Sequence, residues 1–123
     1  MICLDTNYLI RGVSEGTAEA GELVAWFKAG QALITPMPAW FEFICGPVTK
    51  NQVTTIRAFL TEIIPFAEIH AIEAARLFNA IHRKRSSRVD AMIAGTAIAA
   101  KARLATNNRA DFKPFLPHGL KLI

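Results

Sequence analysis

The first five residues, Met1-Ile2-Cys3-Leu4-Asp5, form a short apolar run that ends at a carboxylate. Four further short apolar runs follow, and longer stretches with helical patterning separate them. Strands separated by helices of this length predict a parallel sheet covered by helices on both faces. The predicted strands are residues 1–4, 33–35, 63–66, 104–106 and 120–123, and the predicted helices are residues 18–29, 36–45, 52–62, 71–82 and 87–102.

The order of the strands follows from one proline. Pro65 lies inside the third predicted strand, and proline cannot donate a hydrogen bond to a neighbouring strand, so this strand should lie at an edge. An edge position fits the order 3-2-1-4-5, in which the first strand is central. We expect Thr35, at the end of the second strand, to be the N-cap of the helix that follows. The fold class is therefore α/β, with three α/β/α layers.

Composition favours one globular domain over residues 1–123, because 52% of the residues are hydrophobic and no charge block or repeat is present. No stretch reaches the roughly 20 apolar residues of a membrane span. The amino end carries no export signal, so we expect a soluble cytoplasmic protein. Cys3 and Cys45 lie in no metal-binding spacing, and we expect both to be small core residues.

Four cations, Arg83, Lys84, Arg85 and Arg88, lie within a short segment of this chain of net charge +4. Such a cluster suits contacts with nucleic-acid phosphates. The alternative is that basic residues close a helix, where its dipole favours them whatever the function.

Ligands of a parallel sheet bind where the winding reverses, at the carboxyl ends of its strands. Asp5 ends the central predicted strand, so we expect the chemistry there. The alternative role for Asp5 is to cap the turn that follows it.

Asp90 precedes the weakly polar run that begins Ala91-Met92-Ile93-Ala94. If a helix runs through Asp90, the carboxylate shares the buried face with Ile93, Ala94 and Ala97, where it costs several kcal/mol unless it is paired or binds a metal. The alternative is that Asp90 is a helix N-cap.

Glu42 lies inside Ala39-Trp40-Phe41-Glu42-Phe43-Ile44-Cys45, a segment that is apolar almost all round. We therefore expect this carboxylate near the interior of the protein. Its alternative role is a structural ion pair with one arginine. A single shared metal site accounts for Asp5, Glu42 and Asp90 together more simply than three separate structural roles.

Oxygen ligands without histidine or cysteine select hard cations, so the expected cofactor is Mg²⁺ or Mn²⁺. The three histidines lie in no motif, and no glycine-rich phosphate loop is present. Carboxylates that hold such a metal beside a basic cluster predict phosphodiester hydrolysis by an activated water.

Four segments resemble the motifs of PIN domains, and most closely those of the VapC type, the ribonuclease toxins of toxin-antitoxin pairs. The resemblance extends from Met1 to about residue 115. The segments are Leu4-Asp5-Thr6-Asn7, Ala39-Trp40-Phe41-Glu42-Phe43, Arg88-Val89-Asp90-Ala91-Met92-Ile93-Ala94 and Leu104-Ala105-Thr106-Asn107-Asn108-Arg109-Ala110-Asp111-Phe112.

The resemblance implies a Mg²⁺- or Mn²⁺-dependent endoribonuclease with Asp5, Glu42 and Asp90 as metal ligands. Thr6, Asn7 and Thr106 match positions that line or orient the site, and Arg85 and Arg88 are the expected RNA contacts. Many PIN domains have a fourth acid where this chain has Asn108, whose amide oxygen can ligate a metal but brings no charge. Asp111 either supplies that charge to the metal or caps the following turn.

VapC-like proteins are usually dimers inhibited by a small antitoxin, so the resemblance implies RNA, an antitoxin and a second copy as partners. Five aromatic residues could serve such interfaces or the core: Trp26, Phe27, Trp40, Phe41 and Phe43.

Two rival functions stay open. Asp5-Thr6-Asn7 resembles the DxD motif of aspartate-nucleophile phosphatases, but position 7 is not an aspartate. A PIN-like module that binds RNA or a partner without cutting is compatible with Asn108.

Overall fold

The computed structural model describes all residues, 1–123, and contains a four-stranded parallel sheet. The strands are β1 (Ile2–Leu4), β2 (Leu33–Pro36), β3 (Glu62–Ile64) and β4 (Arg103–Ala105), in the order β3-β2-β1-β4. Cys3 of the central strand pairs with Ile34 on one side and with Leu104 on the other. The predicted edge position of the third strand is confirmed, because β3 pairs with β2 alone, although Pro65 follows β3 and does not lie inside it.

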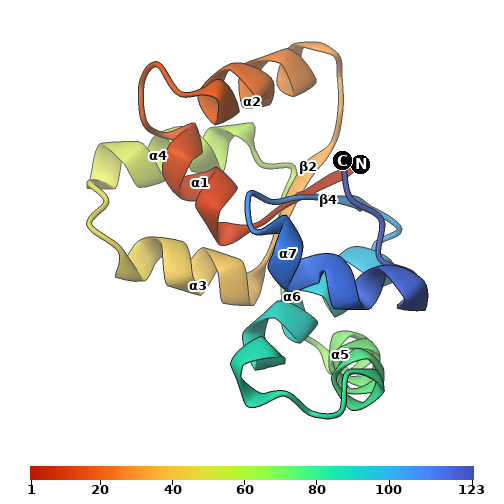
Figure 1. Cartoon of the computed structure of the whole chain (residues 1–123). Coiled ribbons are helices and arrows are strands. Elements are labelled where there is room, and N and C mark those ends of the chain that lie inside the picture. The colour runs from red at the N-terminus through yellow and green to blue at the C-terminus, as the bar shows by residue number, and fades with distance from the viewer.

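Helices surround this sheet, with α1, α2 and α4 on one side in Figure 1 and α5 and α6 on the other. Most lie within a few residues of the predicted ranges; α1 was expected only as a turn. The helices are α1 (Thr6–Gly12), α2 (Ala18–Lys28), α3 (Met37–Cys45), α4 (Lys50–Phe59), α5 (Glu68–Ala80), α6 (Arg88–Ala99) and α7 (Arg109–Phe112), and short 3-10 helices cover Arg85–Ser87 and Lys113–His118.

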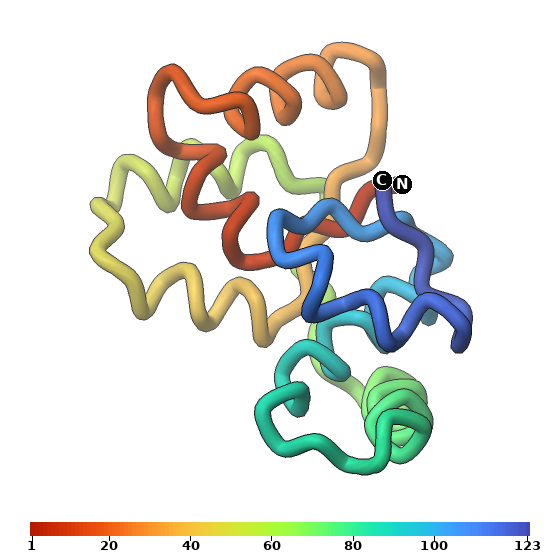
Figure 2. The backbone as a smooth tube through the Cα atoms, viewed as in Figure 1, coloured from red at the N-terminus to blue at the C-terminus, as the bar shows by residue number.

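The prediction of a fifth strand over residues 120–123 is wrong. Only Leu122 pairs with the sheet, through one parallel bridge to Leu104. Leu120 cannot join the ladder because it turns into the core, where it is 3% exposed and its N–H bonds to the carbonyl of Phe115. The segment does lie beside β4, as the predicted order required. Figure 2 shows the two chain ends close together there, because β4 pairs with β1 on one side and with Leu122 on the other.

The core is built from the strands and the helix faces that cover them, and all three residues of β1 are buried. Gly95 of α6 brings α5 close, because a Cβ at this position would lie 2.7 Å from the backbone nitrogen of Ala74. The prediction that Thr35 caps α3 is wrong. Thr35 belongs to β2, and its hydroxyl donates to the carbonyl of Leu4 at 2.9 Å, which ties β2 to the central strand beside Asp5. None of the helices is of a length and apolarity that would let it span a membrane.

Candidate active site

Asp5 lies at the carboxyl end of the central strand and is 4% exposed. Its Oδ1 accepts a hydrogen bond from the backbone N–H of Thr6 at 2.8 Å, and its Oδ2 accepts one from the Thr106 hydroxyl at 2.7 Å. Asp5 is also the N-cap of α1, so its capping role and its position at the strand end occur together. Burial raises the pKa of this carboxyl, although both hydrogen bonds act to lower it, and the charge of Asp111 raises it further.

Glu42 approaches from α3, and its Oε1 accepts a hydrogen bond from the Thr6 hydroxyl at 3.2 Å. The prediction that Glu42 lies near the interior is wrong, because the side chain is exposed. The buried face of α3 consists of Ala39 and Phe43, and Glu42 lies beside that face. No arginine pairs with Glu42, so the alternative role of a structural ion pair is wrong as well.

Asp90 is the third residue of α6, whose N-cap is Ser87, so Asp90 is not the helix cap. Ile93, Ala94 and Ala97, the residues predicted to share its face, are buried. Burial raises the pKa of the Asp90 carboxyl to about 6, and the nearby charges of Asp5, Asp111 and Glu42 add to the effect.

The loop between β4 and α7 supplies the remaining polar groups. The N–H of Asn108 donates to the Thr106 hydroxyl oxygen at 3.0 Å, and the Asn108 side chain is exposed. Asp111 is exposed and lies within α7, so it does not cap the following 3-10 helix, whose N-cap is Phe112. Its charge acts instead on Asp5 and Asp90.

We call Asp5, Glu42, Asp90 and Asp111 the acidic cluster. None of the four has a cationic partner, because the two ion pairs of the structure are Arg11 with Glu19 and Arg76 with Glu73. Uncompensated carboxylates with no histidine or cysteine form a donor set that suits Mg²⁺ or Mn²⁺. As placed, they do not converge into a ready-made cage of three or more ligands.

The predicted RNA-contact residues lie just before Asp90 in the chain. Arg85 is exposed in a 3-10 helix, and Arg88 begins α6 with its guanidinium 5.8 Å from the centre of the Phe78 ring. Neither arginine pairs with a carboxylate. The basic cluster therefore lies on the chain segment that leads into the acidic cluster.

Asn7, which was predicted to line the site, is half-buried on α1, between Thr6 and the core residue Tyr8.

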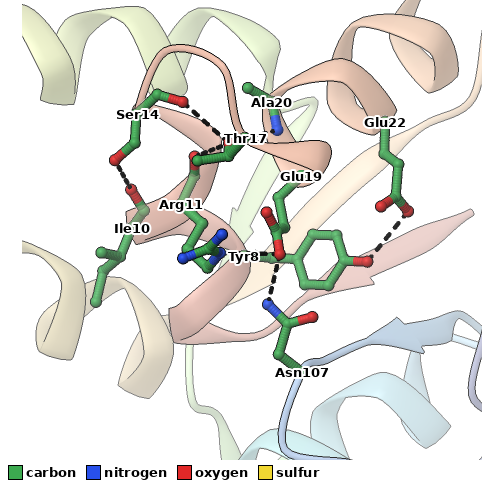
Figure 3. Close-up of polar contacts among 9 residues, drawn as sticks. All are labelled: Tyr8, Ile10, Arg11, Ser14, Thr17, Glu19, Ala20, Glu22 and Asn107. Atoms are coloured by element: carbon green, nitrogen blue, oxygen red, sulfur yellow. Dashed lines mark hydrogen bonds and ion pairs between the residues drawn. The ribbon is translucent and has the colours of Figure 1, made fainter.

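Sequence reasoning missed a second polar network, which Figure 3 shows beside α1 and α2. Glu19 accepts from the Asn107 side-chain amide at 3.0 Å and forms an ion pair of 2.9 Å with Arg11. The sequence could have indicated Thr17 as the N-cap of the helix that carries Glu19, and in the structure the Thr17 hydroxyl oxygen accepts from the N–H of Ala20. The contact with Asn107 spans 88 positions, and no local pattern indicates it.

The five aromatic residues divide between core and surface. Phe43 is buried, and Trp26 and Trp40 are partly buried against the core. Phe27 and Phe41 are exposed, and Phe41 shares one face of α3 with Met37 and Ile44, which are exposed too. Cys3 is buried as expected, whereas Cys45 is exposed, which corrects the prediction that both are core residues.

Comparison with known proteins agrees with this geometry. The sequence matches the model of the PIN domain family over residues 2–113. No curated protein matches the chain in sequence.

Several solved structures share its fold. One is the VapBC2 complex of Rickettsia felis bound to a promoter DNA fragment, with a TM-score of 0.78 and 23% identity over 100% of this chain and 98% of that one. A toxin-antitoxin complex from Klebsiella pneumoniae is similar with a TM-score of 0.72 and 26% identity, over 91% of this chain and 90% of that one. DNA-bound VapBC from Salmonella typhimurium is similar with a TM-score of 0.77 and 19% identity, over 99% of this chain and 96% of that one.

Proposed function

The chain belongs to the PIN domain family, and we propose that it is a Mg²⁺- or Mn²⁺-dependent endoribonuclease and the toxin of a toxin-antitoxin pair. The observation that carries the proposal is the acidic cluster, whose carboxylates lie near enough to the carboxyl end of the central strand for the charges of the other three to act on Asp90, and none of which has a counter-ion. The charges of the buried Asp5 and the half-buried Asp90 cost stability, and binding a hard cation offsets that cost.

The residues of the cluster divide the work. Asp5 is the best-fixed oxygen donor, because Thr6 and Thr106 hold its two carboxylate oxygens in place. Glu42 and Asp90 bring further oxygen ligands from α3 and α6, and Asp111 adds the charge that Asn108 does not bring. A divalent cation bound there would lower the pKa of a water molecule and stabilise charge that grows on the phosphoryl oxygens.

RNA is the proposed substrate because Arg85 and Arg88, neither of which pairs with a carboxylate, lie within five residues before Asp90 in the chain. A phosphate held at the acidic cluster leaves its neighbours along the strand within reach of such cations. Guanidinium groups bind phosphate oxygens through paired hydrogen bonds. These contacts would position the strand without reading its sequence.

Metal-dependent cleavage of RNA tests the function. The chelated protein should leave RNA intact, and added Mn²⁺ or Mg²⁺ should restore endonucleolytic cleavage. Hydrolysis of small phosphomonoesters instead of RNA would favour the rival function, an aspartate-nucleophile phosphatase. RNA binding with no turnover under any metal would contradict the nuclease and favour a non-catalytic PIN-like module.

We also propose a homodimer and a small antitoxin as partners. The support is the exposed apolar face of α3, which presents Met37, Phe41 and Ile44, together with the toxin-antitoxin complexes among the structural relatives. Apolar faces of this kind are typical of protein interfaces.

Sedimentation tests the dimer. The wild type should sediment as a dimer at micromolar concentration, and Phe41→Lys as a monomer. The matched control is Ile72→Lys on α5, because both side chains are 62% exposed, and it should remain a dimer. A monomeric wild type would contradict the dimer. Co-expression with the product of a short neighbouring reading frame, followed by an RNA cleavage assay, tests for an antitoxin.

A further inference from the structure

Glu19 is a nearly buried carboxylate outside the acidic cluster. Its side chain is 10% exposed, and it lies in the first turn of α2. The hydroxyl of Thr17 caps this helix and also donates to the carbonyls of Arg11 and Ser14, so the start of α2 is tied to the end of α1. The network in Figure 3 thus holds Glu19 in one place.

The carboxylate of Glu19 connects two parts of the chain that are far apart in sequence. Its Oε1 accepts from Arg11 Nε at 2.9 Å and from Asn107 Nδ2 at 3.0 Å. Arg11 is on α1, whereas Asn107 belongs to the loop after β4. A single oxygen of Glu19 therefore anchors that loop to the first helix.

The two neighbours of Asn107 face the acidic cluster. Thr106 donates to Asp5 Oδ2 at 2.7 Å, and the N–H of Asn108 donates to the same threonine hydroxyl oxygen at 3.0 Å. The Asn107 side chain points the other way, toward Glu19 (Figure 3). The loop is consequently held on both sides, by Asp5 and by Glu19.

We propose that Glu19 is a positioning residue for the acidic cluster: by holding Asn107, it keeps the Thr106 hydroxyl on Asp5. This inference rests on the proposed nuclease function. Glu19 acts through Asn107 and Thr106 and does not touch the substrate. Hydrogen-bond partners that orient a ligand in this way commonly change metal affinity or activity about 10- to 100-fold when they are removed.

The environment of the second carboxylate oxygen indicates that Glu19 does more than stabilise the fold. Its second oxygen, Oε2, is buried and accepts no hydrogen bond from another residue. A buried acceptor without a partner costs free energy, and such departures from optimal stability are concentrated at functional sites. The ion pair with Arg11 offsets little of that cost, because the arginine side chain is 53% exposed.

The chain offers a matched control on the same helix. Glu22 accepts from the Tyr8 hydroxyl at 3.1 Å and does not contact the loop after β4. The comparison uses Glu19→Ala, Glu19→Gln, Asn107→Ala and Glu22→Ala. Three quantities are measured: kcat on saturating RNA, Mn²⁺ affinity by calorimetry, and the amide resonance of Asn108 in a ¹H–¹⁵N spectrum.

Glu19→Ala and Asn107→Ala should each lower kcat and weaken Mn²⁺ binding about 10-fold, the lower end of the range for direct partners of a ligand. Glu19→Ala, which leaves residue 107 unchanged, should also shift the Asn108 resonance. The double variant should lose no more than the larger single loss, because both changes break one contact. Glu19→Gln keeps an acceptor for Asn107 and should recover most of the rate. Glu22→Ala should leave kcat and the Asn108 resonance at their wild-type values.

Wild-type kcat and wild-type Mn²⁺ affinity in Asn107→Ala would overturn the proposal, even if Glu19→Ala fails to fold. A loss of kcat equally large in Glu22→Ala would also overturn it, because that result indicates a general effect of α2. If the wild type cleaves no RNA, the proposed function fails, and the Mn²⁺ affinity and the Asn108 resonance still decide the role of Glu19.

Discussion

The Thr106 hydroxyl donates a hydrogen bond of 2.7 Å to Asp5 Oδ2, although 101 positions separate the two residues in the sequence. The parallel pairing of β1 with β4 produces this contact, because it places the carboxyl ends of both strands at the same edge. One oxygen of Asp5 is thereby fixed by a neighbouring strand and the other by its own helix.

Thr106→Val tests this contact, because valine has the shape of threonine without the hydroxyl. The substitution should lower cleavage about 10- to 100-fold, as expected when the partner of a metal-ligating carboxylate is lost. Thr106→Ser keeps the hydroxyl and should retain most of the activity. Equal rates in the two variants, measured on saturating RNA, would show that the hydrogen bond does not matter for cleavage.

The raised pKa of Asp90 predicts how the metal-free protein responds to pH. Between the ordinary value of 3.8 and about 6, the folded protein binds more protons at Asp90 than the unfolded chain does. The free energy of unfolding should therefore decrease as pH rises from about 4 to about 6. The measurement is thermal unfolding in chelator across this range.

Asp90→Asn supplies the control for that experiment, because it removes the titrating group while keeping the size of the side chain. The variant should be less sensitive to pH than the wild type over the same range and more stable than the wild type at pH 7. A wild type that gains stability relative to Asp90→Asn from pH 4 to 6 would contradict the assigned shift. Added Mn²⁺ should stabilise the wild type more at pH 7 than at pH 5, because metal ligands must be deprotonated.

The salt dependence of RNA binding tests the basic cluster. Arg85→Ala combined with Arg88→Ala should reduce the slope of log K against log salt by about 0.7 for each lost contact to single-stranded RNA. The control removes two exposed lysines on other helices, Lys28 and Lys50, and should leave the slope unchanged. The same reduction in both double variants would assign the effect to net charge alone.

Gly95 and Gly21 form a matched pair for stability. Alanine at Gly95 would meet the backbone of Ala74, so Gly95→Ala should destabilise the fold by about 1–3 kcal/mol. Gly21 lies within α2 with no atom within 4 Å of an added Cβ, so Gly21→Ala should stabilise the fold by about 0.5–1 kcal/mol. Denaturant unfolding measures both, and a stabilising Gly95→Ala would show that α5 and α6 pack less closely than described.

The sequence alone predicted the parts of the fold that local patterns control. Short apolar runs located all four strands, and the third was correctly assigned to the edge, although Pro65, on which that assignment rested, follows β3 directly. The position of Asp5 at the end of the central strand followed from the same reasoning. The sequence also predicted that Asp5 and Asp90 share one site. The structure brings the two carboxylates to one region, where the charge of Asp5 acts on Asp90.

The predictions that the structure contradicts concern features that depend on tertiary packing. Leu120 is apolar because it packs into the core. Its apolar side chain made residues 120–123 resemble a strand, although only Leu122 forms a bridge to the sheet. Glu42 was expected inside because its neighbours are aromatic, yet only one face of α3 has anything to pack against, and Phe41 remains exposed. The contact of Glu19 with Asn107 joins segments whose proximity only the folded sheet creates.

Cleavage assays on Asp5→Asn and Asp90→Asn decide whether the acidic cluster is one metal-dependent catalytic site. Each variant keeps the size of the side chain and removes one ligand charge, so the protein should fold with wild-type or higher thermal stability. Neither variant should cleave RNA above background in saturating Mn²⁺. Wild-type kcat in either folded variant would contradict this assignment of the acidic cluster.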